Sequence, residues 1–195
     1  MRTLVFASSN KGKIAELKAL LGDAWDVKSA SDFPQIPEVD EDRDTFEGNA
    51  AKKAHTFARA TGVWALADDS GLEVDAMNGR PGVYSARYAP TEAERIEKML
   101  GELQGVPDEK RTARFRCVLC LAFPDGTERF AKGTCEGAIG HAPRGTHGFG
   151  YDPIFVLPGG KTMSELTRDE KAGLSHRGHA FRKLKTVLDE LAAGR

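Results

Sequence analysis

Apolar residues recur along the chain at two different spacings, and these spacings predict the order of the structural elements. Short apolar runs are typical of buried strands, whereas apolar residues three or four positions apart mark one face of a helix. The clearest helical stripe lies near the end of the chain, at Phe181, Leu184, Leu188 and Leu191. The expected strands cover residues 3–7, 24–28, 63–67, 72–75, 112–123, 127–134 and 154–157, and the expected helices cover 11–21, a segment from 45 onward, 91–103 and the segment after LSHRG.

Strands and helices alternate in the first half of the chain, and a hairpin follows with its turn at Asp125 and Gly126. The alternation indicates parallel strands, and the hairpin indicates antiparallel ones. The expected fold class is therefore α/β, with a mixed β-sheet flanked by helices. The length of 195 residues suits a single domain over residues 1–195 that contains two lobes.

The charge balance excludes some classes of partner. The 28 basic and 29 acidic side chains give a formal net charge of -1, which provides no uniform field to attract nucleic acid or a membrane surface. No run of about 18 apolar residues occurs, so no membrane span is expected. The opening segment MRTLVFASSNKGK has too short an apolar stretch for a signal peptide. The sequence thus predicts a cytoplasmic protein that binds neither nucleic acid nor membranes.

A polar loop joins the first expected strand to the first helix. It consists of Ser8, Ser9, Asn10, Lys11, Gly12 and Lys13. The free N–H groups at a helix N-terminus favour phosphate, and a lysine adds charge. The loop is not a Walker A motif, because it has one glycine and Ile14 follows the last lysine. An ordinary helix capped by Asn10 explains the same residues, and on this motif alone that interpretation is somewhat favoured.

An acidic segment, PEVDEDRD at residues 37–44, precedes the helical segment TFEGNAAKKA. A dense acidic loop is usually only solvated, but it could supply one oxygen ligand to Mg²⁺, which binds few carboxylates and keeps several waters. Lys53 lies on the helix that follows, and by itself it is best explained as a surface lysine.

The apolar run at residues 63–67 ends at Asp68 and Asp69, and Ser70 and Gly71 follow. Successive strand residues point to opposite faces, so the two carboxylates cannot do the same job. One of them is free to face a site at the carboxyl end of the strand. Ser70 and Gly71 are expected to turn the chain, and a turn of this composition without any function fits about equally well.

The last cluster combines an aromatic loop with the start of the final helix. Phe149 lies between two glycines, where its ring either stacks on a base, worth about 1–3 kcal/mol, or packs into the core. Ser175 is a suitable N-cap, but His176 and Arg177 then place cations in the first turn, against the dipole by about 0.3–1 kcal/mol. Such a local conflict indicates function. Arg177 can donate a fork of hydrogen bonds to a base edge, and Lys171 is a second donor.

Each cluster is weak alone, but together they supply what a nucleoside triphosphate needs. The segments SSNKGK, TFEGNAAKKA, ALADDSGLEVDAMNGRPGVYSARYA, GFGYDPIF and LSHRG, in this order, resemble the inosine triphosphate pyrophosphatase family, which acts on non-canonical purine nucleotides. The resemblance extends from about residue 3 to residue 188. It implies an elongated mixed sheet, an active site in a central cleft between two lobes, a homodimer and a Mg²⁺ requirement. The implied reaction cleaves ITP, dITP and XTP to the monophosphate and pyrophosphate.

The resemblance also assigns roles to residues. It makes Asp69 the catalytic carboxylate, which binds Mg²⁺ or orients the attacking water, with Asp68 in support. The second metal ligand falls in the acidic segment, where Asp40 and Glu41 are both candidates. The implied substrate-binding residues are Ser8, Ser9, Asn10, Lys11, Gly12, Lys13, Lys53, Ser70, Phe149, Gly150, Tyr151, Asp152, Lys171, Ser175, His176 and Arg177.

Three alternatives compete with this prediction. One is a pyrophosphatase for other modified or pyrimidine nucleotides, which only the family resemblance disfavours. Another is a nucleotide-binding sensor without turnover, disfavoured because pure binding does not require the paired carboxylates Asp68 and Asp69. A third is a nucleic-acid-binding protein that uses Phe149 as a stacking platform, disfavoured by the net charge of -1.

Overall fold

The computed structural model describes residues 2–192, apart from the side chains at positions 168, 169, 172 and 192. The strands are β1 (Arg2–Phe6), β2 (Trp25–Ser29), β3 (Trp64–Val74), β4 (Thr112–Ala122), β5 (Glu128–Ile139) and β6 (Phe155–Val156). The α-helices are α1 (Lys11–Leu21), α2 (Phe46–Thr61), α3 (Glu92–Glu102), α4 (Arg168–Leu174) and α5 (His176–Ala192). Short 3-10 helices cover Gly22–Ala24, Ala30–Asp32, Asp75–Met77, Gly82–Arg87, Asp108–Lys110 and Met163–Glu165.

The six strands form one sheet in the order β2-β1-β3-β4-β5-β6. β1 runs parallel to both β2 and β3, whereas β6 runs antiparallel to β5. The sheet is therefore mixed, and the α/β fold class predicted from the sequence is confirmed. The expected single domain with an elongated form and a central cleft stays a prediction.

The expected turn at Ser70 and Gly71 is wrong, because β3 continues through them without a break. Tertiary contacts outweigh the turn composition here. Gly71 is buried, and the next residue is fastened in the strand because the Leu72 N–H donates a hydrogen bond of 2.8 Å to the buried Ser85 hydroxyl. Turn propensity is a weak prior that burial and pairing routinely override.

Asp68 and Asp69 consequently lie in the middle of β3 rather than at its end. They nevertheless lie just beyond the last residue pair between β1 and β3, Phe6 with Leu66. The parallel part of the sheet therefore ends where the carboxylates begin, which is where open α/β sheets place their ligands.

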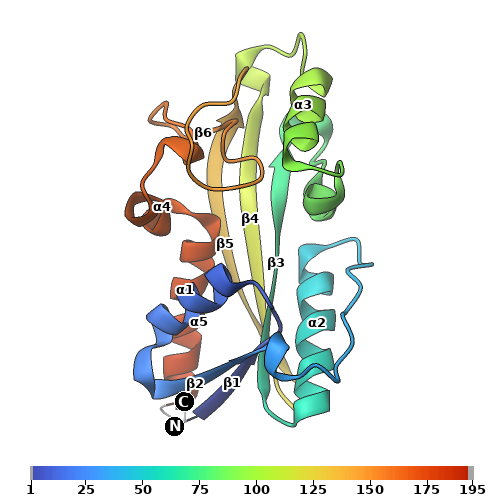
Figure 1. Cartoon of the computed structure of the whole chain (residues 1–195), viewed down its shortest axis with the longest axis vertical. Helices are drawn as coiled ribbons and strands as arrows, with labels where there is room; N and C mark the ends of the chain where they lie inside the picture. Colours follow the sequence, from blue (N-terminus) through green and yellow to red (C-terminus); the bar gives the residue numbers. More distant parts are fainter. Residues whose placement is uncertain (1, 193–195) are drawn as a thin grey trace. The chain divides into compact units, whose positions relative to one another are not determined.

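The chain divides into two compact units. Unit 1 comprises Met1–Asp69, Cys117–Lys132 and Ala180–Arg195, and unit 2 comprises Ser70–Arg116 and Gly133–His179. In unit 1, Figure 1 shows α1 and α5 on one side of the strands and α2 on the other. The α1 and α5 side is closed by a core that joins the strands to both helices, and Phe6 of β1 meets Phe181 of α5 edge to face at 6.4 Å.

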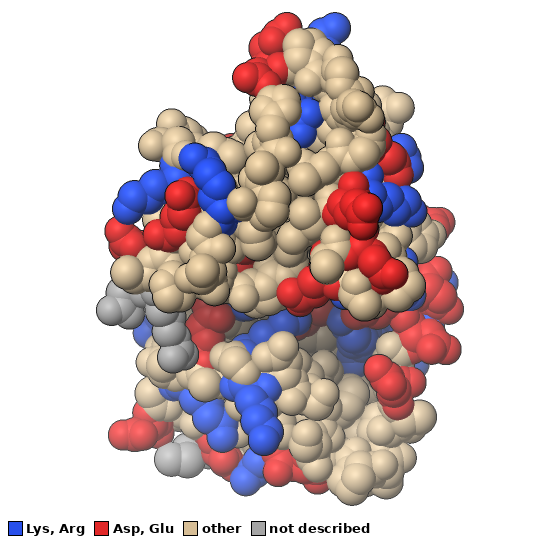
Figure 2. Space-filling view, turned by 45° about the horizontal axis from the view of Figure 1, so that its top comes forward, with Lys and Arg blue, Asp and Glu red and all other residues tan. Residues whose placement is uncertain are grey.

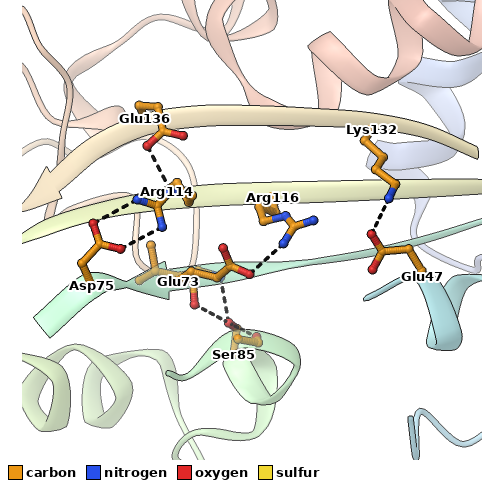
Figure 3. A network of polar contacts seen from close by, with 10 residues as sticks. Glu47, Glu73, Asp75, Ser85, Arg114, Arg116, Lys132 and Glu136 are labelled. Carbon is orange, nitrogen blue, oxygen red and sulfur yellow. Dashed lines mark hydrogen bonds and ion pairs between the residues drawn. The ribbon is translucent and has the colours of Figure 1, made fainter. Parts of the chain in front are cut away.

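Unit 2 has its own apolar core, to which β3, β4, β5 and α3 all contribute. Glu73 of β3 and Arg114 and Arg116 of β4 alternate with buried apolar residues (Figure 3). Arg114 binds Asp75 at 2.8 Å and Glu136 at 3.1 Å, and Arg116 binds Glu73 at 3.1 Å. These pairs give the alternation of a sheet with one apolar face and one polar face.

Charges of both signs are interspersed over the face drawn in Figure 2, in keeping with the net charge of -1. Within residues 2–192, no helix has both the length and the apolar character needed to cross a bilayer.

Candidate active site

Asp68 and Asp69 have different partners, as the alternation along a strand requires. Asp68, which is only 3% exposed, forms an ion pair of 2.7 Å with Lys13 near the start of α1. A carboxylate removed from water is costly unless it is paired, so Lys13 accounts for the burial of Asp68. The same contact holds the lysine amino group at the N-terminal end of α1, where anions are favoured.

Asp69 is 6% exposed, and it is held from the α2 side. The Nδ2 amide of Asn49 donates a hydrogen bond of 2.9 Å to Asp69 Oδ2. The Oδ1 atom of Asn49 accepts a second bond, also 2.9 Å, from the backbone N–H of Arg43. Asn49 is absent from the residues predicted from the sequence. The sequence nevertheless contains an indication of its role, since Asn49 is a polar residue in the apolar stripe between Phe46 and Ala50.

Lys53 joins the acidic loop, residues 40–44, to β3. Its amino group donates a hydrogen bond of 2.6 Å to the backbone carbonyl of Asp68 and forms an ion pair with Glu41. The interpretation of Lys53 as a plain surface lysine is therefore wrong, because its side chain is only 15% exposed. Of the two candidate metal ligands in this loop, Glu41 is half-buried beside Lys53, and Asp40 is exposed.

The first polar loop has the geometry of a capped helix. Asn10 Oδ1 accepts from the Lys13 N–H at 3.1 Å, and the Ser8 hydroxyl accepts from the Asn10 N–H at 3.2 Å. Lys11 and Gly12 are exposed in the first turn of α1. The cap does not compete with anion binding, because a helix N-terminus has four N–H groups without partners inside the helix and the cap engages few of them.

The metal expected from the resemblance can be tested against this donor set. In the described part of the chain, no three His, Cys, Asp or Glu side chains gather in a group that could hold a metal ion. Zinc, which is usually held by three or four protein ligands, fits such a set poorly. Mg²⁺ fits it, because Mg²⁺ is commonly bound by one or two carboxylates together with water and substrate phosphates. Asp69 and Glu41 are carboxylates of that kind.

A second cluster of predicted residues lies in unit 2. Asp152 is 5% exposed, accepts a hydrogen bond of 3.0 Å from the Phe149 N–H and forms an ion pair with Lys171. The Lys171 amino group lies 5.2 Å from the centroid of the Phe149 ring. Phe149 is 58% exposed, so the alternative that places its ring in the core is wrong. Asp152 thus positions both an open aromatic face and an amino group.

Gly148 makes this arrangement possible. Its φ of +86° lies in the left-handed region, and a Cβ atom there would overlap Asp152 Oδ2 and lie 3.0 Å from Lys171 Nζ. We expect Gly148→Ala to destabilise the fold by about 1–3 kcal/mol and to raise KM for the substrate through displacement of Asp152. Thermal unfolding and steady-state kinetics measure the two effects.

A matched control is Gly101→Ala in α3, where an added Cβ meets nothing within 4 Å. This change is expected to stabilise the protein by about 0.5–1 kcal/mol and to leave KM unchanged. Equal KM values for the two variants would contradict the role given to Gly148.

Ser175, His176 and Arg177 lie at the junction of α4 and α5. The Ser175 hydroxyl accepts a hydrogen bond of 3.0 Å from the Gly178 N–H, which confirms the predicted N-cap. The His176 ring stacks on Phe115 of β4, with centroids 5.0 Å apart and planes 19° apart. This contact fixes the orientation of the His176 ring.

Tyr151 is placed differently from the other members of the cluster. Its ring is buried in the core of unit 2, and its hydroxyl donates a hydrogen bond of 2.8 Å to the Ser85 carbonyl. Burial raises the pKa of Tyr151 far above its usual value, which keeps the hydroxyl protonated as a donor. Its neighbour Gly150 has a φ of +63°. Ser70, the first residue of unit 2, is half-buried on β3.

Comparisons with known proteins find relatives that span nearly the whole chain. The dITP/XTP pyrophosphatase of Shouchella clausii is 51% identical over 193 residues, spanning 97% of this chain and 98% of the relative. The dITP/XTP pyrophosphatase of Streptomyces coelicolor is 48% identical over 198 residues, spanning 98% and 99%.

Solved structures of related proteins have the same fold as this chain. A HAM1 protein from Coxiella burnetii matches with a TM-score of 0.93 at 44% identity, over 97% of this chain and all of that one. The Ham1 protein of Staphylococcus aureus matches with a TM-score of 0.91 at 40% identity, over 96% and 98%. Because the profile of the Ham1 family also matches residues 4–187, nearly the whole length, the chain belongs to the Ham1 family.

Proposed function

We propose that this protein hydrolyses the non-canonical purine nucleotides dITP, XTP and ITP to the nucleoside monophosphate and pyrophosphate, with Mg²⁺ as cofactor. Relatives that are 48–51% identical in sequence over nearly the full length are named dITP/XTP pyrophosphatases, which supports the substrate class and the reaction. The observation that carries the proposal is the pair of buried carboxylates on successive residues of β3, each held by a different partner.

The unit 1 cluster suits attack on a phosphate chain. Expulsion of pyrophosphate from the α-phosphorus concentrates negative charge, which cations and helix N–H groups can stabilise. Lys13 and Lys53 are both already held at β3, so little reorganisation is needed to place them. Asp69 is the carboxylate that would orient the attacking water or accept its proton.

Asp69 and Glu41 would hold Mg²⁺ together with the substrate phosphates. The bound ion would neutralise charge on the phosphate oxygens and lower the pKa of water near it. Lys53 pairs with Glu41 and binds the Asp68 carbonyl, and through these contacts it would keep the acidic loop beside β3.

The unit 2 cluster suits a 6-keto purine. Hypoxanthine and xanthine present an acceptor at O6 and a donor at N1, whereas adenine presents the reverse. Donors such as Arg177, Lys171 and His176 would match the keto base and leave a buried group unpaired against adenine. A site of this kind can reject the wrong ligand by about 10⁴–10⁵-fold. The exposed ring of Phe149 is available for stacking on the base.

The test is an assay of pyrophosphate and orthophosphate release from dITP, XTP, ITP, ATP, GTP and CTP, with Mg²⁺ and with EDTA. We expect pyrophosphate release from the first three, little from ATP and CTP, and almost none with EDTA. Orthophosphate as the direct product would place the attack on another phosphorus and refute the proposed reaction. Turnover in EDTA would refute the metal requirement alone.

The same assay separates the runner-up functions. Turnover confined to a pyrimidine or another modified nucleotide would favour a different house-cleaning pyrophosphatase, and binding of ITP without turnover would favour a sensor. We also propose that the protein is a homodimer, as the resemblance implies, and that it acts in the cytoplasm, as expected from the sequence. Light scattering coupled to size-exclusion chromatography would test the dimer.

A further inference from the structure

Asn49 is a buried polar residue for which the proposed chemistry has no role. It is 1% exposed on the inner side of α2, among apolar neighbours such as Ala50 and Ala54. Burial of an amide costs free energy unless it is hydrogen-bonded, and alanine would be the better helix former at this position. Neither packing nor helix propensity explains an asparagine at this position. The explanation must lie in the groups that its polar atoms bind.

Both polar atoms of Asn49 bind groups of the candidate site. Nδ2 donates to the carboxylate of Asp69, and Oδ1 accepts from the N–H of Arg43 in the acidic loop, each at 2.9 Å. An amide carries a donor and an acceptor on one short side chain, whereas a carboxylate can only accept. Asparagine can therefore make both contacts at once, which aspartate and alanine cannot.

We propose that Asn49 is a positioning residue that fixes the Asp69 carboxylate and ties it to the acidic loop. The Asn49 side chain thereby fixes the position of the loop that carries Glu41 relative to the strand that carries Asp69. This inference rests on the proposed function, since it concerns the orientation of the carboxylates that would hold the metal and the water.

The packing of the loop supports this role. A Cβ atom on Gly48 would lie 2.9 Å from Arg43 Cβ, so the loop lies directly against the first turn of α2. Thr45 caps that turn by accepting the Gly48 N–H at 3.0 Å. The close approach brings the Arg43 N–H within reach of Asn49.

Lys52 provides a matched control. Its amino group binds the Asp40 carbonyl at 2.8 Å and Asp42 Oδ1 at 2.9 Å. Lys52 therefore also ties the acidic loop to α2, but through contacts on the exposed side of the loop and not to Asp69. Substitution of Lys52 removes contacts between the loop and α2 only. Substitution of Asn49 also removes the hydrogen bond to the Asp69 carboxylate, so the two variants distinguish attachment of the loop from orientation of the carboxylate.

The first experiment measures Mn²⁺ binding to the nucleotide-free protein by electron paramagnetic resonance, and steady-state kinetics with dITP and Mg²⁺. For Asn49→Ala we expect a rise of about 10–100-fold in the Mn²⁺ Kd and a comparable fall in kcat, as is typical when a partner of a metal ligand is lost. At saturating Mg²⁺, KM for dITP should stay within about threefold, because the groups that bind the nucleotide in the ground state are retained. Lys52→Met should resemble the wild type in the Mn²⁺ Kd and in kcat.

Asn49→Asp is the second variant, and it decides the result if Asn49→Ala does not fold. It preserves the shape of the side chain and the acceptor for Arg43, and it removes the donor to Asp69. We expect kcat to fall by about tenfold or more while the unfolding temperature without metal indicates a folded protein. Wild-type kcat in Asn49→Asp, or an equal loss in Lys52→Met, would overturn the inference. Absence of turnover in the wild type would instead refute the proposed function.

Discussion

Replacement of Asp69 by asparagine is expected to lower kcat for dITP by about 10²–10⁴-fold, the usual contribution of a positioned general base. The amide has nearly the shape of the carboxylate, so the packing around this buried position should be preserved. It cannot accept a proton from water, and it carries no charge for a metal ion. Pyrophosphate release at saturating dITP and Mg²⁺ measures the loss, and thermal unfolding reports whether the fold remains.

Glu73→Gln on the same strand is the control for this experiment. Glu73 pairs with Arg116 at 3.1 Å and lies in unit 2, within the polar network of Figure 3. Its replacement removes a negative charge from β3 without touching Asp68 or Asp69, so turnover should remain near that of the wild type. Near-wild-type turnover in Asp69→Asn would remove Asp69 from the mechanism, and a large loss in both variants would point to a general electrostatic effect.

The second large effect is expected in substrate choice. Arg177→Ala should lower the ratio of kcat/KM for ITP to that for ATP, a preference that donor readout can raise to about 10⁴–10⁵. The loss of one charged hydrogen bond, about 1.5–3 kcal/mol, corresponds to a fall of roughly 10–150-fold in that ratio. The measurement is kcat/KM for both nucleotides under the same Mg²⁺ concentration.

Arg182→Ala is the matched control for Arg177→Ala, because Arg182 lies on the same helix and is exposed. It removes the same charge from α5 and should leave the preference unchanged. An unchanged preference in Arg177→Ala would refute the proposal that this side chain reads the base. Equal losses in the two variants would indicate a long-range effect of charge rather than a contact.

Much of the fold could be predicted from the spacing of apolar residues. The stripe of α5, the N-caps at Asn10, Thr45 and Ser175, and the hairpin of β4 and β5 depend on local patterns, and the structure confirms them. The seven-residue α4 was not predicted, because it is too short to show a helical period. The turn expected at Ser70 failed for a different reason, since burial and the distant Ser85 decide the conformation there.

Some features of the candidate site could likewise be predicted from the sequence, and others could not. Asp68 and Asp69 were predicted to play unequal parts from strand alternation alone, and their different partners agree with that expectation. Asn49 could not be assigned, because a polar residue on an apolar stripe acquires meaning only when its partner is known. The assignment of Lys53 as a surface lysine failed likewise, because Glu41 and the Asp68 carbonyl meet it only in the folded chain.

The pairing of Phe6 with Leu66 has a consequence for how this protein can vary. A shift of one residue in the pairing of β3 with β1 would turn every side chain of the strand to the opposite face. Asp68 would then face α2 and Asp69 would face α1, so both carboxylates would remain but their partners would be exchanged. An insertion or deletion of one residue between Leu66 and Asp68 should therefore abolish activity without removing a single catalytic group. Length changes are better tolerated in surface loops, such as the one that contains Asp125.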